Sequence, residues 1–285
     1  MTLCFPKYKV GFYRKESRIQ LGVYSRMIYF NTKAPVKDVY LQAAHMMGFD
    51  SPVNELYNYS EFFNNGIQPS AKALEKLFDT KKEYIVINPN ASDLRIERRW
   101  GESSYINLIN LIAEQYPDKQ IILTGSSEET VYVEHIYNGT DEKYRHNVVN
   151  TAGKLSLKEL LVLIRNCSLM ITNDSGPMHI AFAMKKKTIA LFGPCSPVEY
   201  SSQQNVIFIY KNIYCSPCVH HFSISPCNGD NQCMKLIQVN EVFNKVVKIF
   251  SGTVDWDSVS NPPQNKILYY SNPENITYGI VKRNN

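Results

Sequence analysis

The sequence lacks several features that mark whole classes of proteins. No apolar run approaches the ~18 residues that a membrane-spanning helix needs. The first residues, 1–7, contain no apolar core segment, so we expect no secretory signal. There is also no internal repeat and no low-complexity tract. With 44% apolar and 20% charged residues, the composition excludes a disordered or fibrous chain.

A strong excess of charge of one sign is absent as well. Lys and Arg number 31 and Asp and Glu number 26, a net charge of +5. That excess is too small to indicate nucleic acid as a partner, and we expect none. It is compatible with an anionic substrate or an anionic membrane surface. A length of 285 residues predicts about two domains of ~150 residues.

The cysteines do not form the even set of a disulfide scaffold. There are seven, and Cys4, Cys167 and Cys195 are scattered along the chain. This usage indicates a reducing compartment, and we expect a cytoplasmic protein.

The other four cysteines lie close together in the sequence, as Cys215-x2-Cys218-x8-Cys227-x5-Cys233. Four thiolates can bind Zn²⁺ tetrahedrally, and His220 and His221 are spare candidate ligands. The alternative is a long loop with buried or partly oxidised thiols. The wide spacing of the second pair weakens the metal hypothesis, so we expect no metal here.

Short apolar runs that end in Asn, Gly or Tyr alternate with helical patterns in the middle of the chain. Strands buried on both faces of a parallel sheet have this character. The expected strands are Tyr84–Asn88, Gln120–Gly125, Asn147–Asn150, Leu169–Asn173, Thr188–Gly193 and Val206–Tyr210. The expected helices are Ser103–Tyr116, three that begin near Ser126, Ser156 and Ser175, and Val239–Phe250. The alternation predicts an α/β fold with a complete, doubly wound, Rossmann-like domain over residues 84–250.

The two ends of the chain have a different character. Residues 1–80 contain too few elements for a full domain and resemble the end of one. The elements expected there are strands at Lys9–Tyr13 and Arg26–Phe30 and helices at Val36–Met47 and Ser70–Phe78. The tail, 251–285, is polar, and Ile267–Tyr270 and Ile276–Val281 could pair as a hairpin.

The strongest candidate site is the turn from Asn173 to His179. A strand ends there and a helix begins, which places it where open α/β sheets bind ligands. The N-terminus of a helix suits phosphate, and Gly176 lets a ligand approach the backbone. Ser175 and His179 share one face of the first turn. The alternative is an ordinary N-cap turn with a hydrogen-bonded histidine.

Two further turns follow neighbouring strands. Arg95, Arg98 and Arg99 could clamp a pyrophosphate, or they could belong to a solvated loop anchored by Trp100. Glu128 could accept hydrogen bonds from ribose hydroxyls, or it could belong to a simple helix cap.

Together these segments resemble glycosyltransferase family 9, the ADP-heptose:lipopolysaccharide heptosyltransferases. The resemblance covers residues ~84–250, and it extends weakly over 9–50. Its motifs are Asn173-Asp174-Ser175-Gly176-Pro177-Met178-His179-Ile180-Ala181, Ala190-Leu191-Phe192-Gly193-Pro194, Asn88-Pro89 with Arg98-Arg99-Trp100, Gly153-x-Leu155-Ser156-Leu157, Cys215-x-Pro217-Cys218 and Cys233-Met234.

The resemblance implies a GT-B fold, in which two Rossmann-like domains face a cleft and the C-terminal one binds a nucleotide-sugar donor. It implies inverting sugar transfer without a metal or other cofactor. By position in the motifs, Arg98 is expected to face the diphosphate and Glu128 to lie near the ribose. The residues expected to hold the phosphates and the donor sugar are Asp174, Ser175, Gly176 and His179.

About a hundred residues of the family's acceptor domain, including the aspartate expected to act as general base, have no counterpart in the sequence. We therefore expect residues 1–80 to be a partial acceptor-side domain and cannot assign a catalytic residue. The expected activity is transfer of heptose from an ADP-sugar to a lipid-linked lipopolysaccharide core, at the cytoplasmic face of the inner membrane. The alternatives are a nucleotide-sugar-binding protein without catalysis and a zinc-stabilised interaction module.

Overall fold

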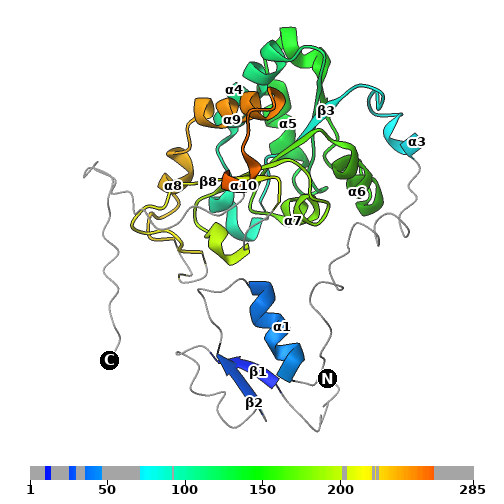
Figure 1. Cartoon of the computed structure of the whole chain (residues 1–285). Helices are drawn as coiled ribbons and strands as arrows, with labels where there is room; N and C mark the ends of the chain where they lie inside the picture. Colours follow the sequence, from blue (N-terminus) through cyan, green and yellow to red (C-terminus); the bar gives the residue numbers. More distant parts are fainter. Residues whose placement is uncertain are drawn as a thin grey trace. The chain divides into compact units, whose positions relative to one another are not determined.

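The computed structural model of the chain describes residues 10–13, 26–29, 36–46, 71–91, 93–200, 204–219, 222 and 225–259. The chain divides into two units. The smaller comprises Met1–Asn58 with Val198–Ser201, and the larger comprises Tyr59–Pro197 with Ser202–Asn285. Each unit is described separately below (Figure 1).

In the smaller unit, two short strands and a helix match the expected elements within a residue or two at each end. Strand β1 (Val10–Tyr13) pairs in parallel with β2 (Arg26–Tyr29), and helix α1 spans Val36–Met46. The Phe12 and Tyr40 rings meet edge to face, with centroids 5.1 Å apart. That this unit is part of an acceptor-side domain stays a prediction.

The larger unit is built on a sheet of six parallel strands. They are β3 (Tyr84–Asn88), β4 (Gln120–Leu123), β5 (Val148–Asn150), β6 (Leu169–Asn173), β7 (Thr188–Phe192) and β8 (Val206–Tyr210). Their order across the sheet is β5-β4-β3-β6-β7-β8. This is the order of a classical dinucleotide-binding fold, and it confirms the expected doubly wound architecture.

Helices cover both faces of this sheet (Figure 1). The core on one face joins Ile85 and Ile87 to helices α4 (Glu102–Gln115), α5 (Thr130–Gly139) and α9 (Val239–Phe250). On the other face, Tyr84 and Val86 pack against α3 (Ala71–Leu74), α6 (Leu157–Asn166) and α7 (Gly176–Ala183). Successive residues of a strand point to opposite faces, so both faces of β3 are apolar. The remaining short helices are η2 (Asp93–Arg98), η3 (Glu142–Asn147), η4 (Pro197–Tyr200), α8 (Gln232–Lys235) and α10 (Trp256–Val259).

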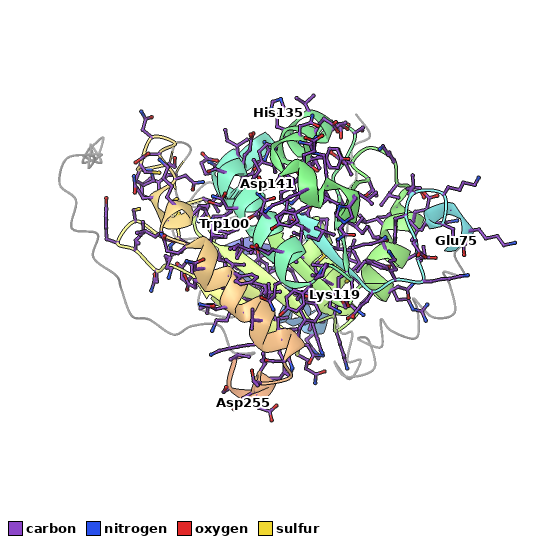
Figure 2. The ribbon with its side chains drawn as sticks, turned by 90° about the horizontal axis from the view of Figure 1, so that it is seen from above. Glu75, Trp100, Lys119, His135, Asp141 and Asp255 are labelled. Carbon is purple, nitrogen blue, oxygen red and sulfur yellow. The ribbon has the colours of Figure 1, made fainter. Side chains whose placement is uncertain are left out.

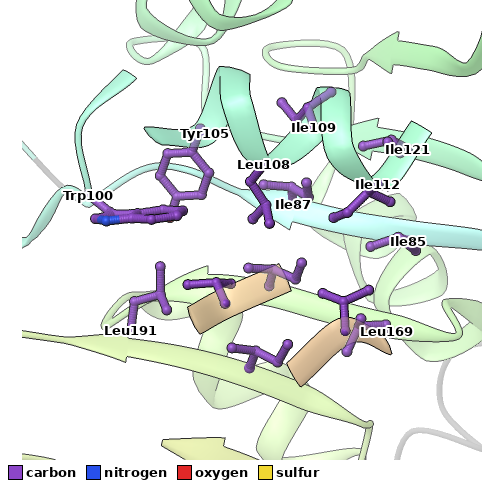
Figure 3. Close-up of a cluster of buried hydrophobic side chains, with 14 of the residues drawn as sticks. Ile85, Ile87, Trp100, Tyr105, Leu108, Ile109, Ile112, Ile121, Leu169 and Leu191 are labelled. Carbon is purple, nitrogen blue, oxygen red and sulfur yellow. The ribbon is translucent and has the colours of Figure 1, made fainter. Parts of the chain in front are cut away.

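One cluster of buried side chains lies where α4 packs on the sheet (Figure 3). Leu108 and Ile112 of α4 are fully buried over β3. Burying one such side chain stabilises the fold by about 1.5–3 kcal/mol. Near the N-terminus of α4, the Trp100 and Tyr105 rings meet edge to face with centroids 5.1 Å apart. This contact ties the loop that follows β3 to the core.

Two helices differ from the sequence-based expectation. The segment expected over 70–78 is helical only in α3, and Leu77 and Phe78 then turn back with both N–H groups bonded to the Leu74 carbonyl. Helix α5 begins at Thr130 instead of near Ser126. Glu129 does accept the Ser126 N–H at 2.8 Å, but this bond closes a turn ahead of the helix. The capping box at Ser156 forms with both of its bonds.

No helix within the described ranges is long and apolar enough to cross a membrane. The expected hairpin in the tail lies outside the described residues, as do Cys4, His220 and His221.

Candidate functional site

The candidate site lies where the strand order of the sheet reverses, between β3 and β6. Chain connections leave these two neighbouring strands in opposite directions, which opens a crevice beyond their carboxyl ends. Asn88 is the last residue of β3, and its Cα pairs with that of Thr172 in β6. The turn after β3 and the turn after β6 therefore lie next to each other at this edge of the sheet. These turns carry the two candidate segments, which were expected to share one edge.

Hydrogen bonds between buried side chains lock the two strand ends together. Asn88 Nδ2 donates to Thr172 Oγ1 at 3.2 Å and to Ser175 Oγ at 2.9 Å. The hydroxyls of Thr172 and Ser175 lie 3.2 Å apart. The Ser175 hydroxyl, expected to contact the donor, is thus engaged by the protein and shapes the turn.

A second network, around Asn173, holds the loop that carries the arginines. Asn173 Oδ1 accepts a hydrogen bond of 2.9 Å from the Tyr105 hydroxyl and one of 3.4 Å from the Trp100 backbone N–H. Its Nδ2 donates to the carbonyl of Pro89 at 2.8 Å. Asn173 is fully buried, so these bonds also satisfy a polar group that would otherwise be costly to bury.

The structure brings Arg98 and Asp174 together, although they come from different segments. Arg98 Nε lies 3.6 Å from Asp174 Oδ2. The Asp174 side chain is only 3% exposed, whereas that of Arg98 is 23% exposed. Among the described residues, no hydrogen-bond donor reaches the buried Oδ2 of Asp174. This oxygen is closed to solvent, so the neighbouring Arg98 guanidinium balances its charge.

The N-terminus of α7 is open for a ligand. Ser175 stands at the N-cap position, yet its side chain makes no cap hydrogen bond, because the hydroxyl is turned toward Asn88. Pro177 occupies the first turn, as expected. Gly176 is exposed, and an added Cβ there would meet nothing within 4 Å. The helix end therefore combines an uncapped first turn with free space beside its backbone.

His179 belongs to the same cluster of charges. His179 is an exposed residue, yet the atoms around its imidazole remove part of its water and so lower its pKa, while Asp174 raises the pKa and Arg98 lowers it. The lowered pKa keeps the imidazole neutral at pH 7, able to donate one hydrogen bond and accept another. Its ring also meets that of Phe182, with centroids 6.2 Å apart.

Glu128 lies on the next turn along the same edge, after β4. It is exposed, and hydrogen bonds from its own backbone and from Ser126 and Ser127 lower the pKa of its carboxyl. It is therefore an ionised acceptor at pH 7, as its expected contact with a ribose requires.

The sequence analysis included Asn88 and Asn173 in the candidate segments but assigned no role to them, although their side chains support the site. The exposed fraction of each of these residues is at most 1%, and each is the last residue of an apolar strand. A polar residue at the last position of an otherwise apolar strand is the signal that could have identified them, because burial obliges it to find partners.

The four clustered cysteines lie near one another in space. Burial, together with Cys215 and Cys227, raises the pKa of the Cys218 thiol to about 11. Burial likewise raises the pKa of Cys233, with smaller contributions from the other three. Within the described residues, no group of three or more His, Cys, Asp or Glu side chains is arranged to hold a metal ion.

Parts of the chain are similar to known heptosyltransferases. Lipooligosaccharide heptosyltransferase 2 of Campylobacter jejuni is 32% identical over 170 residues, 59% of this chain and 52% of that protein. The enzyme of the same name from Haemophilus influenzae is 40% identical over 100 residues, 35% of this chain and 28% of that protein. The chain thus spans about half, or less, of the length of these relatives.

The fold is also shared with solved structures. The structure of E. coli ADP-heptose LPS heptosyltransferase II superposes with a TM-score of 0.61 and 19% identity, over 86% of this chain and 70% of that one. The likeness agrees with the GT-B type of fold. The model of glycosyltransferase family 9 (heptosyltransferase) matches residues 2–227. Since that match takes in most of the sequence, the chain belongs to glycosyltransferase family 9.

Proposed function

We propose that the larger unit binds the nucleotide-sugar donor of an inverting glycosyltransferase. In this proposal, heptose is transferred from an ADP-sugar to a lipopolysaccharide core acceptor. The observation that carries the proposal is the Arg98–Asp174 pair, placed beside the open N-terminus of α7 at the switch point of the sheet.

The chemistry of the leaving group explains why these residues suit the reaction. When the bond from the anomeric carbon to the diphosphate breaks, negative charge develops on the nucleotide. Fixed donors and cations aimed at that charge lower the barrier. The Arg98 guanidinium has donors beyond the Nε near Asp174, and α7 directs backbone N–H groups and a positive dipole end toward the same space. These groups can neutralise a diphosphate without a metal ion.

The other candidate residues take complementary roles. The free space at Gly176 lets phosphate reach the backbone, and Ser175 holds the turn in shape through Asn88. Asp174 is assigned to orienting Arg98 toward the donor, since its Oδ2 is closed to solvent and faces Arg98 Nε. Neutral His179 can donate to the same sugar or to phosphate. Glu128 is assigned to the ribose.

The acceptor half of the reaction needs a general base. The base removes the proton of the acceptor hydroxyl as its oxygen attacks the anomeric carbon and the diphosphate departs. We assign no residue to this role. In the resemblance it belongs to an acceptor-side domain, of which residues 1–80 are proposed to be a part.

The names of the relatives support the proposed substrates. The relatives from C. jejuni and H. influenzae are named for heptose transfer to lipooligosaccharide, and the E. coli structure is named for ADP-heptose. A lipid-linked acceptor implies that the protein works in contact with a membrane surface, at the cytoplasmic side.

The second candidate function is binding of a nucleotide sugar without catalysis. It is favoured by the placement of all the proposed donor contacts in the larger unit, which supplies no assigned general base. Measuring donor binding by calorimetry and nucleotide release with a lipopolysaccharide-core acceptor separates the two candidates. Binding with acceptor-dependent release, by this chain alone or when a complete acceptor-side domain is supplied, supports the transferase. Binding without release in either case supports the second candidate, and no binding contradicts both.

A further inference from the structure

The segment that carries Arg98 is held from two sides. One side is the Asn173 network described above. The other is a loop that we call the cysteine loop, residues 213–237, of which 213–219, 222 and 225–237 are described. We call residues 95–100, which include Arg98, the arginine segment. Between described residues, three hydrogen bonds join the cysteine loop to this segment. They run from Arg95 Nη2 to the Phe222 carbonyl at 3.1 Å, from Trp100 Nε1 to the Ile237 carbonyl at 2.9 Å, and from Asn231 Nδ2 to the Arg99 carbonyl at 2.9 Å.

The cysteine loop packs against the end of strand β7. A Cβ added to Gly193 would lie 2.8 Å from Cys233 Sγ and 2.5 Å from Met234 Sδ, so glycine is what allows this close approach. Cys233 and Met234 are both buried. The loop therefore links the sheet to the arginine segment as a packed element.

Among the three contacts, that of Asn231 lies nearest to Arg98 along the chain, because the carbonyl it binds belongs to the next residue. Asn231 adopts the left-handed conformation, with φ 55° and ψ 40°, which Asn tolerates better than most residues. Its backbone N–H donates to Cys227 Sγ at 3.3 Å. Its Oδ1 lies 3.8 Å from Cys233 Sγ, the donor in this pair. Both ends of the amide group are thus engaged, which fixes the direction of the Nδ2 donor.

We propose that Asn231 is a positioning residue for the donor site, acting through Arg98. It holds the Arg99 carbonyl and so fixes the backbone from which the Arg98 side chain reaches Asp174 and the diphosphate. This inference rests on the proposed function, since it takes the ligand of Arg98 to be a nucleoside diphosphate. The thiols of Cys227 and Cys233 serve here as hydrogen-bond partners that orient Asn231.

The chain offers a matched control for testing this role. Asn228 lies in the same loop and also adopts the left-handed conformation, with φ 49°. No hydrogen bond joins its side chain to the arginine segment in the described part of the chain. Glycine suits both positions, so Asn231→Gly and Asn228→Gly change the backbone preference alike. Only the first removes the bond to Arg99.

The experiment measures ADP affinity by calorimetry for the full chain and these variants, with thermal unfolding to show that each is folded. Losing one hydrogen bond that positions a binding group is expected to weaken affinity about two- to tenfold. We expect that loss for Asn231→Gly and an unchanged affinity for Asn228→Gly. Equal affinities of Asn231→Gly and the wild type overturn the inference.

A double-mutant cycle tests whether the effect passes through Arg98. In the Arg98→Ala background, Asn231→Gly is expected to cause no further loss of ADP affinity, because the residue it positions is gone. A further loss of the same size as in the wild type overturns the proposed route. Failure of the wild-type chain to bind ADP overturns the proposed function and this inference with it. If the wild-type chain binds ADP but the effects of Asn231→Gly and Arg98→Ala on ADP affinity are independent, this inference alone is overturned.

Discussion

Arg98 Nε lies 3.6 Å from Asp174 Oδ2, and the pair joins the loop after β3 to the turn after β6. The Asp174 carboxylate is almost fully buried while the guanidinium is partly open. This asymmetry leaves the guanidinium on the open side of the pair, where it can face a ligand. In the proposed function, the arginine of this pair faces the diphosphate of the donor.

Replacing Arg98 is expected to weaken nucleotide binding. A charge-assisted hydrogen bond in a partly desolvated site contributes about 1.5–3 kcal/mol, so Arg98→Ala should lower ADP affinity roughly ten- to hundredfold. Calorimetry measures the change, and Arg165→Ala, on an exposed part of α6, is the control of equal charge change. Unchanged binding by Arg98→Ala would move the role to Arg95 or Arg99.

Gly176→Val is expected to abolish ADP-sugar binding while the fold survives. The added side chain meets no protein atom at its Cβ, and it occupies the space through which phosphate approaches α7. Gly176→Ala, with a smaller side chain, should lose less affinity. Circular dichroism checks the fold, and calorimetry measures binding. A folded Gly176→Val variant with wild-type affinity would show that phosphate does not contact this turn.

The pKa of His179 should report the two charges beside it. NMR titration of the imidazole is expected to give a pKa below the ordinary value of 6.5. Arg98→Ala should raise that pKa, because it removes a positive neighbour, and Asp174→Asn should lower it further. Shifts in the opposite directions would contradict the described cluster.

The lowered pKa of His179 also predicts how the free energy of unfolding depends on pH. Because the pKa of His179 is lower in the folded state, the unfolded chain binds more protons between the two pKa values. The free energy of unfolding should therefore fall as the pH drops through the unfolded pKa toward the folded one. In His179→Asn this part of the decline should disappear from urea titrations recorded across that pH range. An identical pH dependence in the variant would argue against the shift.

The cysteine loop is expected to hold less than one zinc per chain in protein purified without chelator. The second cysteine pair is spaced more widely than in common zinc sites, and within the described residues no group of three or more His, Cys, Asp or Glu side chains is arranged to hold a metal ion. Elemental analysis gives the metal content. One zinc per chain, lost together with thermal stability in Cys218→Ser, would establish a structural metal site and favour a zinc-stabilised module.

The alternation of short apolar runs with helical patterns was enough to predict the strands of the sheet. Tyr84–Asn88, Leu169–Asn173 and Val206–Tyr210 were expected with the bounds that the structure has, because each is a short apolar run with a polar residue close to its end. Helix α5 was expected too early: Ser126 and Glu129 have capping-box spacing, but their bond forms in a turn. Local spacing does not reveal whether the backbone after a cap is already helical.

The site could be predicted only in part. The order of strands and turns indicated that the segments of Arg98 and Asp174 share one edge, and the pair between them agrees. Inward rotation of the Ser175 hydroxyl toward Asn88 could not be predicted, because it depends on a partner from another strand. The Asn231 contact was missed for the same reason, since it joins distant parts of the chain.

Turnover by this chain is expected to be far weaker than binding. The proposed donor contacts lie in the larger unit, whereas a positioned general base contributes about 10²–10⁴-fold in rate and no residue here is assigned to it. A coupled assay of nucleotide release with a lipopolysaccharide-core acceptor should give a rate near background. Supplying a complete acceptor-side domain should restore transfer. Robust turnover by the 285-residue chain would show that it contains a base.

The central claim is that the edge between β3 and β6 binds the diphosphate of an adenine nucleotide. A calorimetric comparison of ADP with AMP tests it most directly, because the two ligands differ by one phosphate. The wild-type chain should bind ADP at one saturable site and more tightly than AMP, and Arg98→Ala should remove most of that difference. Equal affinity for the two nucleotides, or a preference for ADP that Arg98→Ala leaves intact, would contradict the account.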